Sequence, residues 1–291
     1  MDPAQQPGEP FSLELPDGRA ISYARYGTRG GWPVLFCHGF PGSRLQAHYL
    51  DSAALVVGAE VLAPDRPGIG CSSNYSFGAI AEWAKDAEAF IDALGLAEFS
   101  AIGVSGGGPY ALATAARVGH RVRGVALVAS PCELARDVIA QMRRFEAMVL
   151  RVARVSPRLV RLAVRRNFGP ENRGRLGMLR SRLDLADQQI IASPKVSASL
   201  AANRALAVAG GTEALERESV LYTRPWGFDL ADVTCQVDAF YGMRDQLTPP
   251  FMGERLVARL PNAQLHLAPG HGHFTLLPAI TDEILQRFRE E

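Results

Sequence analysis

The stretch AIGVSGGGP at residues 101–109 decides the fold of this 291-residue chain. It joins the end of a run at 99–104, which is typical of a strand buried on both faces of a sheet, to a helical segment rich in small residues at 106–118. Between them lies the pattern G-x-S-x-G, whose serine is Ser105. Both glycines fit a tight turn from strand to helix, because larger side chains would collide across it.

A serine at such a turn stands above the edge of the sheet in a strained backbone conformation, where its hydroxyl can act as a nucleophile. The N–H of Gly106 and the start of the helix would point at an oxyanion formed there. The alternative is a glycine-rich turn that has no catalytic role or that binds phosphate. The position after a strand and before a helix favours the nucleophile.

On both sides of this stretch the sequence alternates between strand and helix patterns. Two short strands around a Pro-Asp-Gly turn predict a hairpin at residues 11–15 and 21–24. Further strands are expected at 33–37, 60–63, 99–104, 122–129, 235–241 and 263–267. Helices are expected at 45–57, 80–94, 106–118, 251–260 and 274–289. The alternation predicts an α/β fold, in which helices cover both faces of a mostly parallel sheet of eight strands.

Residues 131–225 interrupt this alternation after the sixth strand with helical periodicity and few strand signals. They carry 17 basic and 9 acidic residues, a net charge of +8, whereas the remainder has a net charge of −7 and the whole chain +1. We expect a core made of residues 11–130 and 226–291 and a helical insertion at 131–225. The polar, proline-rich residues 1–10 are expected to be a disordered tail.

Composition excludes several classes of protein. The chain is 47% hydrophobic, which argues against wholesale disorder, and its near-neutral charge provides no drive toward nucleic acid. No apolar run approaches the roughly 18–20 residues of a spanning helix, and the first ten residues do not resemble a signal peptide. Four scattered cysteines argue against a disulfide framework and a zinc site, namely Cys37, Cys71, Cys132 and Cys235. We therefore expect a cytoplasmic protein that needs neither metal nor cofactor.

A nucleophilic serine requires a base, and the base requires an acid that orients it. The loop at residues 269–274 follows the last strand and contains His271 and His273. Asp245 follows the preceding strand. Loops at the carboxyl ends of parallel strands open at one edge of the sheet, so these residues should lie near Ser105. Position alone does not choose between the two histidines, and Asp245 could instead cap a turn or a helix.

Five motifs together resemble the α/β-hydrolase superfamily, in its branch of capped esterases, lipases and C–C hydrolases. They are HGFPG at 38–42, DRPGIGCS at 65–72, GVSGG at 103–107, GMRD at 242–245 and GHGHF at 270–274. The resemblance covers nearly the whole chain outside the insertion. It implies that the insertion is a cap domain lying over the catalytic edge of the sheet.

The resemblance also implies a role for each matched residue. Ser105 would be the nucleophile, Asp245 the acid and His273, in the family's Gly-His-Phe pattern, the base. The backbone N–H groups of Phe40 and Gly106 would form the oxyanion hole.

The same resemblance leaves other residues without a catalytic role. Asp65 and Cys71 belong to a loop that is structural in the family, and His271 would be a bystander. Some relatives place the acid after the sixth strand, where Glu133 and Asp137 are the alternatives to Asp245.

The serine also indicates the chemistry. Similar epoxide hydrolases and haloalkane dehalogenases use an aspartate at this position, because their covalent intermediate is an alkyl ester. A serine instead favours acyl transfer, and hence hydrolysis of a carboxylic ester or thioester through an acyl-enzyme. The alternatives on the same three residues are a C–C bond hydrolase, a biosynthetic cyclase or an acyltransferase, with a proline iminopeptidase less favoured. A ligand receptor on the hydrolase fold is the non-enzyme alternative.

Several features of the sequence have a role or a binding partner that the pattern leaves open. The arginine-rich segment at 143–166 predicts an amphipathic helix with a solvated basic face. The alternative is that it recruits an anionic or carrier-bound acyl substrate, or a membrane surface. Trp226 and Phe228 are expected to pack in the core rather than line a pocket. Asp238 lies inside a strand where an apolar residue is usual, and its partner is open. So is the choice between monomer and homodimer.

Overall fold

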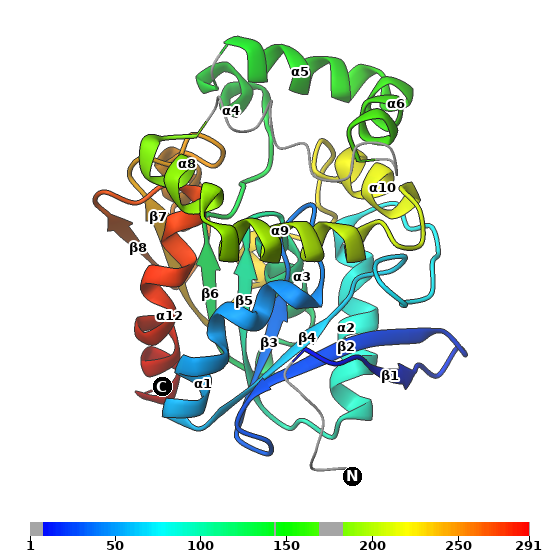
Figure 1. Cartoon of the computed structure of the whole chain (residues 1–291), viewed down its shortest axis with the longest axis vertical. Helices are drawn as coiled ribbons and strands as arrows, with labels where there is room; N and C mark the ends of the chain where they lie inside the picture. The colour runs from blue at the N-terminus through cyan, green and yellow to red at the C-terminus, as the bar shows by residue number, and fades with distance from the viewer. Residues whose placement is uncertain (1–7, 143, 169–182, 291) are drawn as a thin grey trace.

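The computed structural model describes residues 8–142, 144–168 and 183–290 (Figure 1). Most of the tail predicted for residues 1–10 lies outside this range. An eight-stranded sheet forms the centre, in the order β1-β2-β4-β3-β5-β6-β7-β8. Its strands are β1 (Phe11–Glu14), β2 (Ala20–Gly27), β3 (Trp32–Cys37), β4 (Ala59–Pro64), β5 (Phe99–Val104), β6 (Val122–Val128), β7 (Gln236–Gly242) and β8 (Ala263–Ala268). Strand β2 is antiparallel to β1 and β4, and the other pairs are parallel, which confirms the predicted sheet.

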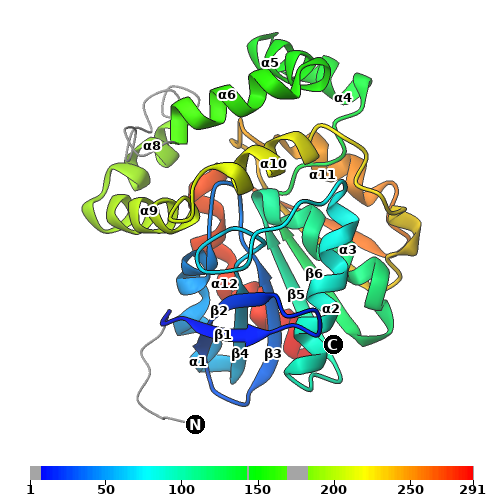
Figure 2. The ribbon, with the colours of Figure 1, turned by 90° about the vertical axis from the view of Figure 1, so that its right-hand side faces the viewer.

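Helices cover both faces of the sheet (Figure 2). Helices α2 (Trp83–Ala93), α3 (Gly108–Val118) and α11 (Pro250–Val257) bury their apolar sides in one core, and α1 (Asp51–Val57) and α12 (His273–Glu290) in the other. The segment expected to form one helix at 45–57 is divided into the 3₁₀ helix η1 (Arg44–Leu50) and helix α1. The first N–H of η1, on Arg44, donates to Asp65 at 2.6 Å, a tertiary contact that helical periodicity does not reveal.

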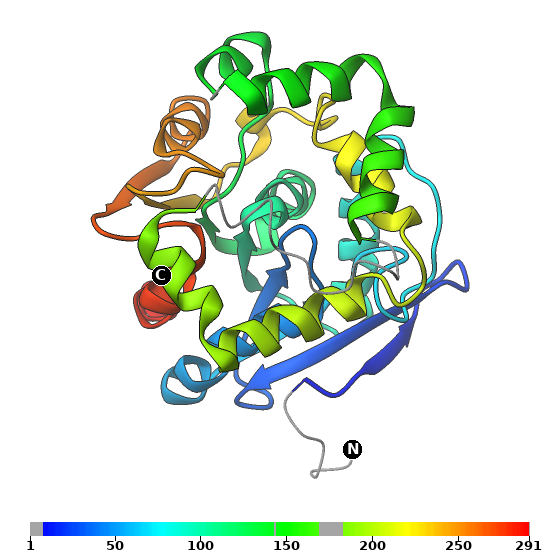
Figure 3. The same cartoon turned by 45° about the horizontal axis from the view of Figure 1, so that its top comes forward.

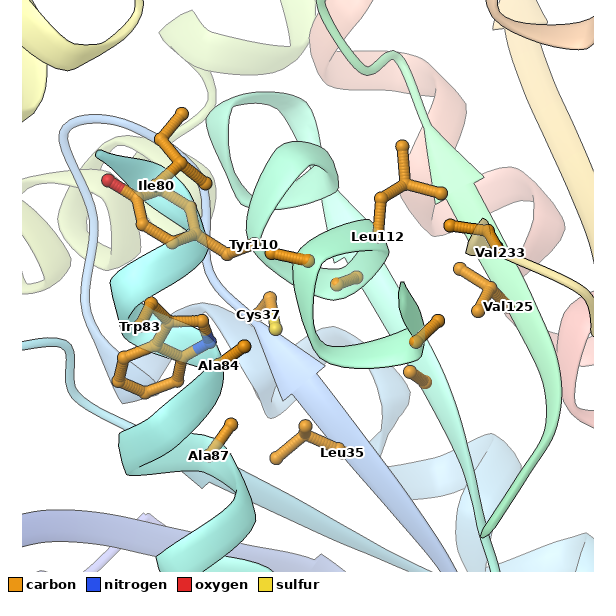
Figure 4. Close-up of a cluster of buried hydrophobic side chains, with 14 of the residues drawn as sticks. Leu35, Cys37, Ile80, Trp83, Ala84, Ala87, Tyr110, Leu112, Val125 and Val233 are labelled. Atoms are coloured by element: carbon orange, nitrogen blue, oxygen red, sulfur yellow. The ribbon is translucent and has the colours of Figure 1, made fainter. Parts of the chain in front are cut away.

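The core on the α3 side determines where the turn that carries Ser105 stands. The ring of Trp83 meets that of Tyr110 edge-on at 6.3 Å, and both side chains are fully buried (Figure 4). Leu112 of α3 lies in the same cluster as Val125 of β6. Truncating a buried aromatic side chain of this kind costs about 3–5 kcal/mol of stability. Helix α3 is therefore firmly packed on the sheet, and its N-terminus stands directly after β5.

Six described α-helices follow β6 and precede β7 in the chain. They lie beyond the carboxyl ends of the central strands (Figures 1 and 3). They are α4 (Arg136–Gln141), α5 (Arg144–Val155), α6 (Pro157–Phe168), α8 (Leu185–Ala192), α9 (Pro194–Ala207) and α10 (Glu213–Leu221). The single helix expected at 143–166 is two helices, since Pro157 has no N–H to continue α5 and instead begins α6. We call α8, α9 and α10 the inner helices and α5 and α6 the outer helices. The division into a core domain and a cap domain stays a prediction.

No helix in the described ranges is long and apolar enough to cross a membrane.

Candidate active site

The turn between β5 and α3 holds Ser105 in a backbone conformation that side chains rarely adopt. Its φ is 50°, in the left-handed region. A side chain at Gly103 would come within 2.6 Å of Gly108 Cα across the turn, as the sequence suggests. A side chain at Gly107 would instead collide with the carbonyl of Cys37, at the end of neighbouring β3. The turn thus depends on close packing against β3 as well as on its own tightness.

The structure brings Ser105, His273 and Asp245 together from three loops. His273 Nε2 lies 3.0 Å from Ser105 Oγ, and His273 Nδ1 lies 2.7 Å from Asp245 Oδ2. Asp245 follows β7, whereas His273 follows β8 and is the first residue of α12. An imidazole between a hydroxyl and a carboxylate can accept the hydroxyl proton at one nitrogen while the other is held by the acid.

The carboxylate of Asp245 is held by its own loop. Its Oδ1 accepts the N–H groups of Leu247 at 2.8 Å and Thr248 at 2.9 Å, and its Oδ2 accepts the Thr248 hydroxyl at 2.8 Å. The residue is only 3% exposed. These donors fix the carboxylate and satisfy its lone pairs, which a buried charge requires.

Electrostatics reinforce this arrangement. Burial by itself would lower the pKa of His273, but the charge and hydrogen bond of Asp245 and the charge of Asp187 outweigh it, so the pKa is raised above its ordinary value. Burial would raise the pKa of Asp245, but its interactions with His273 and Thr248 lower it. Asp245 is therefore ionised at neutral pH and stabilises the protonated form of His273.

The two expected oxyanion donors lie side by side. A Cβ atom added to Gly106 would come within 2.9 Å of Phe40 Cβ, and one added to Gly39 would lie 3.4 Å from Ser105 Cβ. The hydroxyl of Tyr222, just after α10, donates to the Gly106 carbonyl at 2.8 Å. The loop after β3 and the turn after β5 therefore meet beside Ser105, as an oxyanion hole requires.

A cavity of about 500 Å³ opens onto Ser105 and His273. Apolar side chains dominate its wall, including Phe40, Phe168 and Leu200. Polar groups enter it from the insertion, among them Asn203 and Arg204. An apolar cavity with a few polar groups is the usual form of a small-molecule site.

The structure separates the other candidates from this site. Glu133 accepts the Trp226 N–H at 3.2 Å and pairs with Arg259 at 2.8 Å, and Asp137 pairs with Arg255 at 2.6 Å. Neither alternative acid is the partner of His273, because Asp245 occupies that place.

The structure also shows the surroundings of Asp238, Trp226 and His38. Asp238 pairs with the ring of His266 on the neighbouring strand at 2.5 Å, far along the sheet from the cavity. Trp226 is 1% exposed and packs in the core, as expected. His38 is fully buried, and this burial lowers the pKa of its imidazole.

Sequence reasoning missed three residues that contact the candidate site. Thr248 could have been noticed three residues after Asp245, a spacing typical of side-chain capping. Asp187 and Tyr222 lie in the insertion, 86 and 116 residues from their partners, and no local pattern marks them.

Comparison with known proteins agrees with the fold. The sequence model of the α/β hydrolase fold family matches residues 33–279. Haloalkane dehalogenase 2 of Mycobacterium tuberculosis is 31% identical over 303 aligned positions, covering 99% of this chain and 97% of that protein. A second relative is the dihydrolipoyllysine-residue acetyltransferase component of the acetoin cleaving system of Pseudomonas putida. It is 33% identical over an alignment that covers 44% of this chain and 34% of that protein.

Solved structures show the same fold at lower sequence identity. A thermophilic esterase from Thermogutta terrifontis is 23% identical with a TM-score of 0.70, over 97% of both chains. A bromoperoxidase from Bacillus anthracis is 19% identical with a TM-score of 0.74, over 97% of this chain and all of its own. With the family match spanning most of the sequence and the dehalogenase aligning over nearly all of it, the chain belongs to the α/β-hydrolase fold family, a family of hydrolytic enzymes.

Proposed function

We propose that this protein is a serine hydrolase that cleaves a carboxylic ester or thioester through an acyl-enzyme. The observation that carries the proposal is the continuous chain of contacts from Ser105 Oγ to His273 at 3.0 Å and from His273 to Asp245 at 2.7 Å, at the wall of a cavity. Ser105 is the nucleophile, His273 the general base and Asp245 the orienting acid.

The reaction runs in two halves. Ser105 Oγ attacks the substrate carbonyl while His273 Nε2 takes its proton, and the N–H groups of Phe40 and Gly106 bind the oxyanion. The tetrahedral intermediate collapses as His273 gives this proton to the departing alcohol or thiol. A water molecule then attacks the acyl-enzyme with His273 again as base, and release of the carboxylic acid regenerates Ser105.

The identity of the nucleophile argues against the reaction named for the dehalogenase relative. Displacing halide from a saturated carbon with a serine hydroxyl would produce an ether, which has no carbonyl for water to attack. A carboxylate nucleophile produces an ester, which water can hydrolyse. Ser105 therefore supports acyl transfer, despite 31% identity to a dehalogenase.

The cavity favours a small-molecule acyl substrate. Its volume of about 500 Å³ and its apolar wall suit an acyl chain of moderate length. Arg204 lines the same cavity, and its guanidinium lies 5.7 Å from the ring of Phe168. An anionic or carrier-bound substrate stays a further prediction.

A labelling experiment tests the proposal. The folded protein is treated with a fluorophosphonate and digested, and the adduct is located by mass spectrometry. We expect the adduct on Ser105 and no labelling of Ser105→Ala or of denatured protein. Folded wild-type protein that stays unlabelled at Ser105 would contradict the nucleophile.

A substrate panel then separates the alternatives on the same residues. Short and long p-nitrophenyl esters, a thioester, a vinylogous 1,5-diketone and a 1-haloalkane are compared in wild type and Ser105→Ala. We expect ester or thioester hydrolysis that falls by about 10³–10⁶ in Ser105→Ala, and no halide release. Turnover of the diketone alone would favour a C–C hydrolase, and Ser105-independent turnover would contradict the mechanism.

A further inference from the structure

Asp187, in the first turn of inner helix α8, is a buried carboxylate that the proposed mechanism does not use. It is 1% exposed. Its oxygens accept three successive backbone N–H groups at the start of α12, those of His273 at 2.6 Å, Phe274 at 2.9 Å and Thr275 at 3.0 Å. The Thr275 hydroxyl donates to it as well, at 3.1 Å. The carboxylate therefore caps the helix that begins with the proposed base.

Such a cap has a clear physical role. The first N–H groups of a helix have no partner within the helix, and a negative charge there is favoured by the helix dipole. A local residue normally supplies this cap. Here it comes from 86 residues earlier in the chain, out of the insertion. The contact that attaches inner helix α8 to the core therefore also fixes the backbone of His273.

Gly272 provides a second line of evidence. A side chain at this position would collide with the carboxylate of Asp187. The N–H of Gly272 donates to the Thr275 hydroxyl at 2.8 Å, which in turn donates to Asp187. The residue before the base thus leaves room for the carboxylate and joins the same network.

We propose that Asp187 is a positioning residue for the proposed base. By holding the backbone of His273, it keeps the imidazole within reach of both Ser105 and Asp245. The inference rests on the proposed function. Asp187 is absent from the side chains that line the cavity, so it acts through His273 and not on the substrate.

The charge of Asp187 adds to its geometric role. Asp245 acts on the imidazole directly, and Asp187 acts on it through space; both favour its protonated form. Another charged pair at this junction is Arg244 and Asp184, 4.0 Å apart, and substitutions at Asp187 leave both of its charges in place. Removing the charge at 187 should therefore shift the titration of His273 in one direction only, toward lower pH.

Two substitutions in the full-length protein separate geometry from charge. In Asp187→Ala we expect kcat on a p-nitrophenyl ester to fall by about 100-fold with little change in KM, as for a catalytic group displaced by about 1 Å. Asp187→Asn keeps an acceptor oxygen, so kcat should fall less. In both variants the acid limb of the kcat/KM profile should move to lower pH.

Asp86→Asn is the matched control. Asp86 is 2% exposed and accepts two bonds from Arg19 and one from Tyr75, on a helix remote from the cavity. We expect a lower Tm but an unchanged kcat and pH midpoint. Gly272→Ala displaces the carboxylate without altering any charge, so it should lower kcat, and circular dichroism checks that each variant is folded.

Outcomes for the two proposals are distinct. Wild type that is not labelled at Ser105 overturns the proposed function and the inference with it. Wild type that is labelled, with folded Asp187→Ala and Gly272→Ala variants labelled at the same rate, overturns the inference alone. So does a loss of kcat in Asp86→Asn as large as in Asp187→Ala, because the effect would then be one of general stability.

Discussion

The inner and outer helices of the insertion differ in how they are held. The inner helices and the residues just after them reach the core through buried polar contacts around the candidate site. Asp187 caps α12, Asn203 accepts the Ser43 N–H at 2.9 Å, and Glu218 pairs with Arg66 at 2.6 Å. Tyr222 donates to the turn that carries Ser105. Within the proposed catalytic machinery, the backbone of His273 and the turn that carries Ser105 therefore each have a contact that comes from the insertion.

The outer helices are held in a different way. Helix α6 packs on α10 through Val164 and through the pair of Arg165 and Glu216 at 2.6 Å. Large apolar side chains of the outer helices are exposed, namely Met148, Val152, Val155, Leu159 and Leu162. The exposed arginines of the predicted basic face alternate with them. The inner helices thus reach the core through buried polar contacts, whereas helix α6 packs on α10 and contributes Phe168, at its end, to the cavity wall.

The largest effect in this comparison is expected for Glu218, a buried carboxylate of α10. Glu218 and Arg66 are both buried, and Arg66 also donates to the His38 carbonyl at 2.5 Å. Glu218→Ala leaves an uncompensated buried charge, which should lower the free energy of unfolding by about 3–5 kcal/mol. Urea denaturation measures this loss.

Glu216→Ala is the matched control for that prediction. Its partner Arg165 belongs to an outer helix and is 62% exposed, so water can solvate it when Glu216 is removed. We expect a loss of about 1 kcal/mol or less. Equal losses in the two variants would remove the distinction between inner and outer contacts.

The pH dependence of the reaction should depend on the inner helices, through Asp187, and not on the outer helices. Neutral His273 is the base, and its pKa is raised by Asp245 and Asp187 against burial. The acid limb of kcat/KM should therefore have its midpoint above about 6.5, the ordinary histidine value, with activity falling below it. The exposed Arg158 of α6 serves as control, since Arg158→Gln should leave the midpoint in place. A wild-type midpoint below 6.5 would contradict the electrostatics described here.

Tyr222→Phe should have a smaller effect. It removes one hydrogen bond to the Gly106 carbonyl while keeping the ring against Phe40 at 5.6 Å. A single neutral hydrogen bond contributes about 1 kcal/mol, so kcat should fall by up to about tenfold. Steady-state kinetics on one ester would reveal it. A kcat identical to wild type would mean that the Gly106 peptide is held without the tyrosine.

The smallest effect is expected on the outer helices. Leu162 is 63% exposed, so Leu162→Ala should change the free energy of unfolding by about 0.5 kcal/mol or less. Leu215 on inner helix α10 is fully buried, and Leu215→Ala should cost about 2–5 kcal/mol. Thermal and urea unfolding compare the two. A large loss in Leu162→Ala would show that the outer face is covered in solution.

Local pattern was sufficient for much of the fold and for the loops in which the candidate site lies. The alternation of strands and helices predicts the sheet, because burial on both faces leaves continuous apolar runs in the sequence. The glycines around Ser105 mark the turn, because only glycine fits there. The loops that carry Asp245 and His273 could be placed because loops at the carboxyl ends of parallel strands meet at one edge, and the resemblance to the α/β-hydrolase superfamily selected the two residues within them.

Pattern was insufficient where a contact joins distant residues. Periodicity did not show that residues 44–50 form a separate 3₁₀ helix, whose first N–H donates to the distant Asp65. Nor did it choose between Asp245 and the alternatives Glu133 and Asp137, since all three follow strands. Distances make that choice, because Asp245 alone of the three lies against His273.

The sequence pattern alone predicts the alternation of strands and helices along the chain, the turn at Ser105 and the loops that carry the acid and the base. These depend on hydrophobic period and glycine sterics, which act over a few residues. Only the tertiary structure decided that Asp187 caps α12, that Glu218 neutralises Arg66 and that Tyr222 holds the Gly106 peptide. Such pairs form across 86 to 152 residues of chain, and what selects them is the need to satisfy buried charges and N–H groups once the helices have packed.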